Sequence, residues 1–162
     1  MKKLRQGATL LELVVALGIF SLLFYLALAS LTKIQQSHLL ADNLWQTASI
    51  LRRAQSRAMS GEENNDQPLN FGVLFTADYY QEFATSSDYS HRETDFDWQT
   101  DLPSALVFED FNLPDSCLAA ADCLLFSAIE GTPSAAGQIS LKNSSSGEKE
   151  TIFINQLGRV DF

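Results

Sequence analysis

Hydrophobic residues follow three successive patterns along the chain. Residues 10–31 are almost wholly apolar, residues 32–60 repeat apolar positions at steps of three, four and seven, and the remainder alternates with a period of two. The first two patterns predict one helix from about residue 8 to residue 60, ended by Gly61. The third predicts short strands joined by turns rich in Gly, Pro, Asn and Ser.

The apolar stretch is long enough to cross a bilayer. Its 22 residues extend about 33 Å as a helix, against a hydrocarbon core of about 30 Å. Lys2, Lys3 and Arg5 precede it, and because positive residues stay cytoplasmic, the rest of the chain is expected outside the cytoplasm after a single pass. Two simpler interpretations remain open, namely a secretory signal cleaved after Ala29 and an uncleaved signal anchor.

The amphipathic part of the helix is expected to pack on the following domain. Leu40 and Trp45 widen its apolar face, whereas Arg53 and Arg57 lie mostly elsewhere and are interpreted as a solvated surface. The repeating positions of the face are Ala41, Leu44, Ala48, Leu51 and Ala58.

Seven short segments after the helix have the period of strands, and they predict an α+β fold in which an antiparallel sheet or sandwich is laid on the helix. They are residues 71–75, 79–84, 106–111, 124–127, 138–142, 151–155 and 159–162. No internal repeat divides residues 61–162, so this part is predicted to be a single β domain.

The charge of the chain is concentrated in that domain. The net charge is −9, and between Glu62 and Glu130 there are fifteen acidic residues and one basic residue, Arg92. Such a surface disfavours binding to nucleic acid. Residues 88–101 hold five carboxylates, but they lack the EF-hand spacing and its Gly. A solvated loop is therefore expected there, with no metal site.

Few residues suggest chemistry. His38 and His91 are far apart and lack motif context, so neither an enzyme nor a cofactor is expected. Cys117 and Cys123 are expected to form a disulfide if the domain lies outside the cytoplasm, with two reduced thiols as the alternative.

A single carboxylate, Glu12, lies three residues into the apolar stretch. An unpaired carboxylate in a membrane costs about 2–3 kcal/mol at the bilayer centre and less near the interface. Neither a cleaved signal nor a simple anchor needs this residue. A pairing with a positive charge after assembly would explain it.

The stretch KKLRQGATLLELVVALGIF, residues 2–20, resembles the N-termini of type IV prepilins and type II secretion pseudopilins. In that family a short basic leader ends in Gly, and the mature chain begins with one residue, a Thr, two apolar residues and a Glu. Here Gly7 ends the leader and Ala8 begins the mature chain, at a position where Phe or Met is commoner. The apolar helix also lacks the Pro of many major pilins.

The resemblance implies how the chain is processed and assembled. A prepilin peptidase would cut between Gly7 and Ala8 and methylate the new α-amino group of Ala8. The Glu12 carboxylate would then pair with the amino group of Ala8 on a neighbouring subunit, since two charges in a low dielectric stabilise each other. The implied partners are other pilin or pseudopilin subunits, the peptidase, and an assembly ATPase with its inner-membrane platform.

The C-terminal part resembles H-type minor pseudopilins and related minor pilins, through a strand and Gly-rich turn, a hairpin, and a closing apolar strand with a Gly-Arg pair. The resemblance implies a pilin-like fold: a leader (1–7), a transmembrane or filament-core helix (8–31), an amphipathic helix (32–60) and a β domain (61–162). It implies a bacterial inner-membrane precursor that becomes a periplasmic or extracellular filament subunit. Some related minor pilins bind DNA through C-terminal basic residues, but here Arg159 stands alone beside Asp161.

Overall fold

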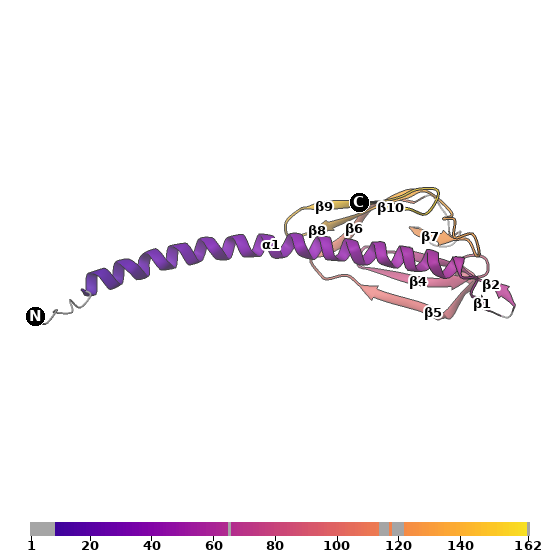
Figure 1. Cartoon of the computed structure of the whole chain (residues 1–162), viewed down its shortest axis with the longest axis horizontal. Helices are drawn as coiled ribbons and strands as arrows, with labels where there is room; N and C mark the ends of the chain where they lie inside the picture. The colour runs from indigo at the N-terminus through magenta and orange to yellow at the C-terminus, as the bar shows by residue number, and fades with distance from the viewer. Residues whose placement is uncertain (1–8, 65, 114–116, 118–121, 162) are drawn as a thin grey trace, which may run out of the picture. The chain divides into compact units, whose positions relative to one another are not determined.

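The computed structural model describes residues 9–64, 66–113, 117 and 122–161. It contains one long helix, α1 (Leu10–Met59), followed by short strands (Figure 1). The strands and the single 3-10 turn are β1 (Glu63–Asn64), β2 (Gln67–Pro68), β3 (Asn70–Phe75), β4 (Tyr79–Thr85), η1 (Tyr89–His91), β5 (Arg92–Asp101), β6 (Leu106–Asn112), β7 (Cys123–Phe126), β8 (Gly137–Asn143), β9 (Lys149–Ile154) and β10 (Val160–Asp161).

The chain forms two compact units, Met1–Gln36 and Ser37–Phe162, and the boundary between them falls inside α1. In the described part of the first unit, the chain is helical from Leu10 onward. The second unit contains the rest of α1 and every strand. Helix α1 ends where Gly61 adopts a positive φ of 66°, as the sequence predicts for a glycine just past a helix.

The strands form two four-stranded antiparallel sheets and a two-stranded hairpin. The strand order is β5-β4-β3-β7 in one sheet and β10-β9-β8-β6 in the other, while β1 pairs with β2. Helix and antiparallel sheets together confirm the predicted α+β class. All seven predicted strand segments correspond to observed strands, namely β3, β4, β6, β7, β8, β9 and β10.

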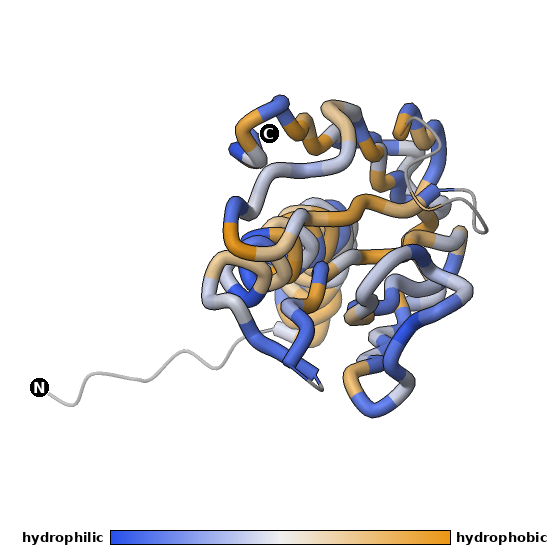
Figure 2. Tube along the Cα trace, turned by 90° about the vertical axis from the view of Figure 1, so that its right-hand side faces the viewer, coloured by the Kyte–Doolittle hydropathy of each residue, from blue (hydrophilic) through white to orange (hydrophobic). Residues whose placement is uncertain are grey.

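One core joins α1 to both sheets. Buried side chains from the helix, such as Leu51, meet Phe71 and Val73 of β3 and Ile139 and Ile152 of the second sheet. In the view along the longest axis of the chain, apolar segments gather around the helix and polar segments lie mostly outside them (Figure 2). Burial of this apolar surface supplies the main driving force for packing the two sheets on the helix.

The predicted helix face is correct along most of its length and wrong at two positions. Leu40, Leu44 and Leu51 are buried, but Ala41 and Trp45 are exposed. The predicted Ala48 and Ala58 are buried, and so is Ala54, which the prediction did not include. Trp45 therefore lies outside the buried face of the helix.

Strand β3 is buried on both of its faces. Phe71, Val73 and Phe75 belong to the main core, while Leu74 belongs to a second cluster on the opposite face, together with Phe83. This explains why β3 reads as a continuous apolar run instead of an alternating one.

The prediction of a solvated loop at residues 88–101 is wrong. The segment forms η1 and the ten-residue strand β5. Its carboxylates do not prevent this, because β5 is an edge strand whose exposed side chains remain in water. The strand is held by backbone pairing with β4 and by the contact of Phe96 with Phe71, at 6.2 Å between ring centroids. The polar composition of the segment does not reveal either contact.

Candidate functional site

The apolar part of α1 presents its side chains to the surroundings. Every large apolar side chain described between Leu10 and Leu31 is at least 46% exposed. The helix is long and apolar enough to cross a membrane, by length and composition. An exposed apolar surface of this extent marks a contact with lipid or protein, because soluble monomers rarely expose patches above a few hundred Å².

Thr9 and Glu12 share a local contact at the start of α1. The side-chain oxygen of Thr9, which precedes α1, accepts a hydrogen bond from the backbone N–H of Glu12 at 3.2 Å. Thr9 and Glu12 thus have the spacing of a capping box, in which Glu or Gln serves equally at the third helical position. Among the described residues, no ion pair involves the Glu12 carboxylate.

The proposed cleavage and methylation positions, Gly7 and Ala8, lie outside the described residues, and both assignments stay predictions. The same holds for the pairing of Glu12 with Ala8 of a neighbour.

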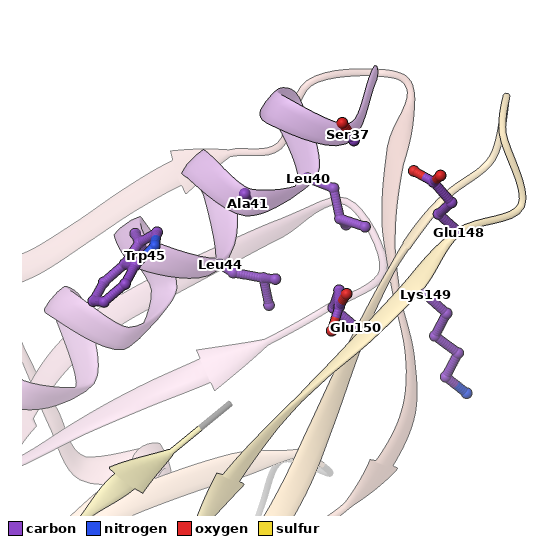
Figure 3. A pocket seen from close by; sticks show the side chains of 8 residues that line it. All are labelled: Ser37, Leu40, Ala41, Leu44, Trp45, Glu148, Lys149 and Glu150. Atoms are coloured by element: carbon purple, nitrogen blue, oxygen red, sulfur yellow. The ribbon is translucent and has the colours of Figure 1, made fainter. Parts of the chain in front are cut away.

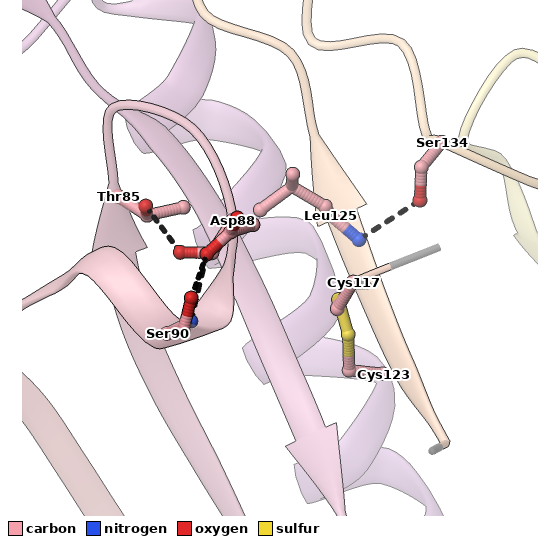
Figure 4. The surroundings of a disulfide bond; sticks show 7 residues. All are labelled: Thr85, Asp88, Ser90, Cys117, Cys123, Leu125 and Ser134. Atoms are coloured by element: carbon pink, nitrogen blue, oxygen red, sulfur yellow. Dashed lines mark hydrogen bonds between the residues drawn. A yellow bond between two sulfur atoms is a disulfide. The ribbon is translucent and has the colours of Figure 1, made fainter. Parts of the chain in front are cut away.

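Cys117 and Cys123 are joined by a disulfide in the structure (Figure 4). Their Cα atoms are 6.1 Å apart, within the usual range for disulfides. Both are 1% exposed and pack with Leu74 and Phe83 on the face of the sheet that lies away from the main core. The bond therefore attaches the chain before β7 to a small apolar cluster.

A buried charge cluster connects α1 with the first sheet. Glu82 of β4 has a side chain only 1% exposed, and its carboxylate accepts hydrogen bonds from two arginines of the helix. Arg53 donates to Glu82 Oε2 from Nε at 2.8 Å and also from Nη2, while Arg57 donates from Nη1 to Glu82 Oε1 at 3.2 Å. The interpretation of Arg53 and Arg57 as a solvated surface is right for Arg53, which is half exposed, and wrong for Arg57, whose side chain is 29% exposed. It also missed their ion pairs, because Glu82 lies 29 residues from Arg53 and the pattern of the helix could not reveal it.

Arg57 is held by three further contacts. Its Nε and Nη2 each donate to the Glu62 carboxylate at 3.0 Å, and its guanidinium lies 4.2 Å from the centre of the Phe71 ring. Burial lowers the pKa of Arg57, but its hydrogen bonds to Glu62 and Glu82 raise that pKa by more, so that it lies above its usual value. These guanidinium charges are neutralised within the fold, which leaves little to attract an external phosphate.

The acidic turn before β5 is organised by its own hydrogen bonds. The Asp88 carboxylate accepts from the backbone N–H groups of Ser90 and His91 and caps η1. Hydrogen bonds from Ser90 and His91 lower the pKa of Asp88 to about 2. Within the described parts of the chain, no group of three His, Cys, Asp or Glu side chains could hold a metal ion.

An open groove of about 520 Å³ runs between α1 and β9, and is called here the α1–β9 groove (Figure 3). Leu40, Leu44 and the exposed Trp45 line its helix side. Glu148, Lys149 and Glu150 line its strand side, beyond the point where the apolar inner face of β9 ends.

The two histidines and Arg159, which the sequence also draws attention to, lie at separate places in the fold. His38 lies on α1 and His91 in η1, where its Nδ1 is 2.9 Å from Asp88. The exposed Arg159 pairs with Asp161 at 2.9 Å, so its charge is balanced.

No protein family, curated protein or solved structure matches this chain.

Proposed function

We propose that this chain is a structural subunit of a pilus-like filament, of the minor pilin or minor pseudopilin kind, in a type IV pilus or a type II secretion pseudopilus. It begins as a single-pass inner-membrane precursor with its domain outside the cytoplasm. A prepilin peptidase removes residues 1–7 and methylates Ala8. The mature subunit then enters the filament through the apolar part of α1, moved by an assembly ATPase and its platform.

The observation that carries the proposal is the continuity of α1. The helix runs without interruption from Leu10 to Met59, so the apolar stretch and the buried helix of the domain are one element. A secretory signal cut after Ala29 would sever this helix in its middle. A cut after Gly7 would leave it whole, and its exposed apolar residues would then be available to neighbouring subunits.

The first test is the mature N-terminus of the chain isolated from its native cells, determined by intact mass and N-terminal sequencing. We expect a chain that starts at Ala8 and carries one additional methyl group on its α-amino nitrogen. A chain that starts at Ser30, or one that retains Met1, would refute the proposal and leave a secreted or anchored β domain of another role.

A pair of substitutions separates the two possible roles of Glu12. Glu12→Gln keeps a side chain suited to the capping box but removes the charge, whereas Thr9→Val removes the capping oxygen and keeps the charge. If Glu12 pairs with a neighbouring amino group, Glu12→Gln abolishes incorporation into sheared filament fractions while leader cleavage continues. If its role is only capping, Glu12→Gln is silent and Thr9→Val shows the larger defect.

A further inference from the structure

The first turn of α1 is fixed by the residue that precedes it. Helix α1 begins at Leu10, directly after Thr9. The side-chain oxygen of Thr9 accepts a hydrogen bond from the backbone N–H of Glu12 at 3.2 Å, and the Thr9 carbonyl accepts one from the backbone N–H of Leu13, also at 3.2 Å. A residue that accepts both bonds is the N-cap of a helix, the position at which the helix stops on its N-terminal side.

The sequence before this cap favours a longer helix. Residues 1–6, MKKLRQ, are all strong helix formers, and Ala8 is of the type with the highest helix propensity. Gly7 is the one poor helix former in this stretch. Because an existing helix extends more easily than a new one starts, helical structure would spread from α1 into residues 1–8 if nothing ended it. Residues 1–8 lie outside the described residues, so this expectation rests on their sequence.

Helical structure across the bond between Gly7 and Ala8 would hinder its cleavage. Within a helix the N–H and carbonyl groups of the backbone are engaged in hydrogen bonds, and side chains surround them on every side. Proteolysis concentrates instead where the backbone is exposed and free of such bonds. The bond between Gly7 and Ala8 lies one residue before the cap at Thr9.

We propose that Thr9 is a positioning residue for leader cleavage. By capping α1, it keeps the bond between Gly7 and Ala8 outside the helix, where a prepilin peptidase can bind it in an extended form. Hydrolysis then adds water across this bond and leaves a carboxylate on Gly7 and an α-amino group on Ala8. Gly7 acts in the same direction as the cap, because a glycine opposes the extension of a helix. The proposal rests on the filament role proposed above and names the feature of this chain that exposes the cleaved bond.

The alternative explanation is that the peptidase contacts the Thr9 side chain directly. Thr9 is the second residue after the cleaved bond, so it is near enough to touch the enzyme. The two explanations differ in which side chains can replace Thr. Capping requires an oxygen that accepts the hydrogen bond from Glu12, and Ser or Asn supplies it as well as Thr does. Direct contact requires the hydroxyl group or the branched shape of Thr.

Cleavage of the purified full precursor by a prepilin peptidase in detergent micelles tests the proposal. We expect kcat/KM for Thr9→Ser and Thr9→Asn to stay within twofold of the wild-type value. Thr9→Val, which keeps the shape of Thr without the capping oxygen, and Thr9→Ala should each lower it about fivefold, the factor that corresponds to a lost N-cap. A loss for Thr9→Asn equal to that for Thr9→Val, or equal rates for all variants, would overturn the proposal.

A leader with low helix propensity supplies the second test. Leu4→Gly/Gln6→Gly makes the leader a poor helix former and keeps its three basic residues. In this background α1 cannot extend far, so the cap is no longer needed. Adding Thr9→Ala should then lower kcat/KM by less than twofold, compared with about fivefold in the natural leader. The same loss in both leaders would show that the peptidase reads Thr9 itself, and would overturn the proposal.

The conformation of the cleaved segment can be followed without the peptidase. In the full precursor in micelles, the Cα chemical shift of Ala8 reports on helical structure at that residue. It should move toward the helical value in Thr9→Val and Thr9→Ala and stay at the wild-type value in Thr9→Asn. An Ala8 shift that is the same in all four proteins would overturn the capping role.

The wild-type reaction separates this proposal from the filament role. If the peptidase cuts the wild-type chain after Gly7 and also cuts Thr9→Val at the same rate, the role of Thr9 is refuted and the filament role stands. If the peptidase does not cut the wild-type chain after Gly7, both are refuted.

Discussion

The buried carboxylate of Glu82 gives the sharpest prediction of stability. Removal of one partner from a buried ion pair costs about 3–5 kcal/mol, because the other charge is left without compensation. Glu82 is 1% exposed and binds both Arg53 and Arg57. Glu82→Gln keeps the size of the side chain and removes only the charge, so the change in stability reports on the pairing.

The expected loss of stability depends on the solvent and the partners that remain to the two arginines when Glu82 is replaced. The Arg53 side chain is 50% exposed and can return to water, while Arg57, at 29%, retains Glu62. We therefore place the loss near the lower end of the range, at about 3 kcal/mol for Glu82→Gln. Arg53→Gln should cost only about 1 kcal/mol, because its exposed guanidinium is screened by solvent and Glu82 still has Arg57.

Urea unfolding of the full chain in detergent micelles measures both values. Both tryptophans, Trp45 and Trp98, are largely exposed, so unfolding is followed by far-ultraviolet circular dichroism. The free energy of unfolding should fall while the dependence on urea concentration stays constant. Arg53→Gln/Arg57→Gln supplies the decisive comparison, since it leaves Glu82 buried without a cation and should cost more than the two single changes together. Equal losses for Glu82→Gln and Arg53→Gln, or a loss below about 1 kcal/mol for Glu82→Gln, would contradict the reasoning.

Two further predictions concern the disulfide between Cys117 and Cys123 and the carboxyl group of Asp88. Replacing Cys117 and Cys123 together by Ser should lower the free energy of unfolding by about 2 kcal/mol, as expected for a short closed loop, and an unchanged urea midpoint would count against this. Because the folded-state pKa of Asp88, about 2, lies below the ordinary value of 3.8, its ionised form stabilises the fold above about pH 4, and that contribution disappears as the pH falls toward about 2. The carboxyl carbon of Asp88, followed by NMR, should titrate near the lower value; a midpoint close to 4 would show that the hydrogen bonds of the turn are absent in solution.

The sequence could predict the local elements because each has a period of its own. The apolar stretch, the helix that follows it and seven strands are all found in these patterns. Strand β5 was missed because its residues are mostly polar, and a propensity argument gives little weight to backbone pairing with β4. The short strands β1 and β2 were missed because two residues are too few to show a period.

The candidate sites divide in the same way. Gly7, Ala8 and Glu12 lie within six residues of one another, so a short motif could predict them. Leader cleavage, methylation and the role of Glu12 can each be tested at these residues. The charge cluster combines Arg53 and Arg57 with Glu82, which are dispersed along the chain and have no pattern in common. Only the packing of β4 on α1 brings these side chains together.

By itself, the sequence determined that a membrane-length apolar helix continues into an amphipathic one and that an α+β domain follows. These features depend on neighbours within a few residues, whose spacing sets which face of a helix or strand is apolar. Tertiary structure alone decided that Glu82 neutralises Arg53 and Arg57, and that Trp45 lines a groove instead of the core. Those outcomes depend on how two sheets close over one helix, because burial, and with it the effect of each charge, is set by residues distant in the chain.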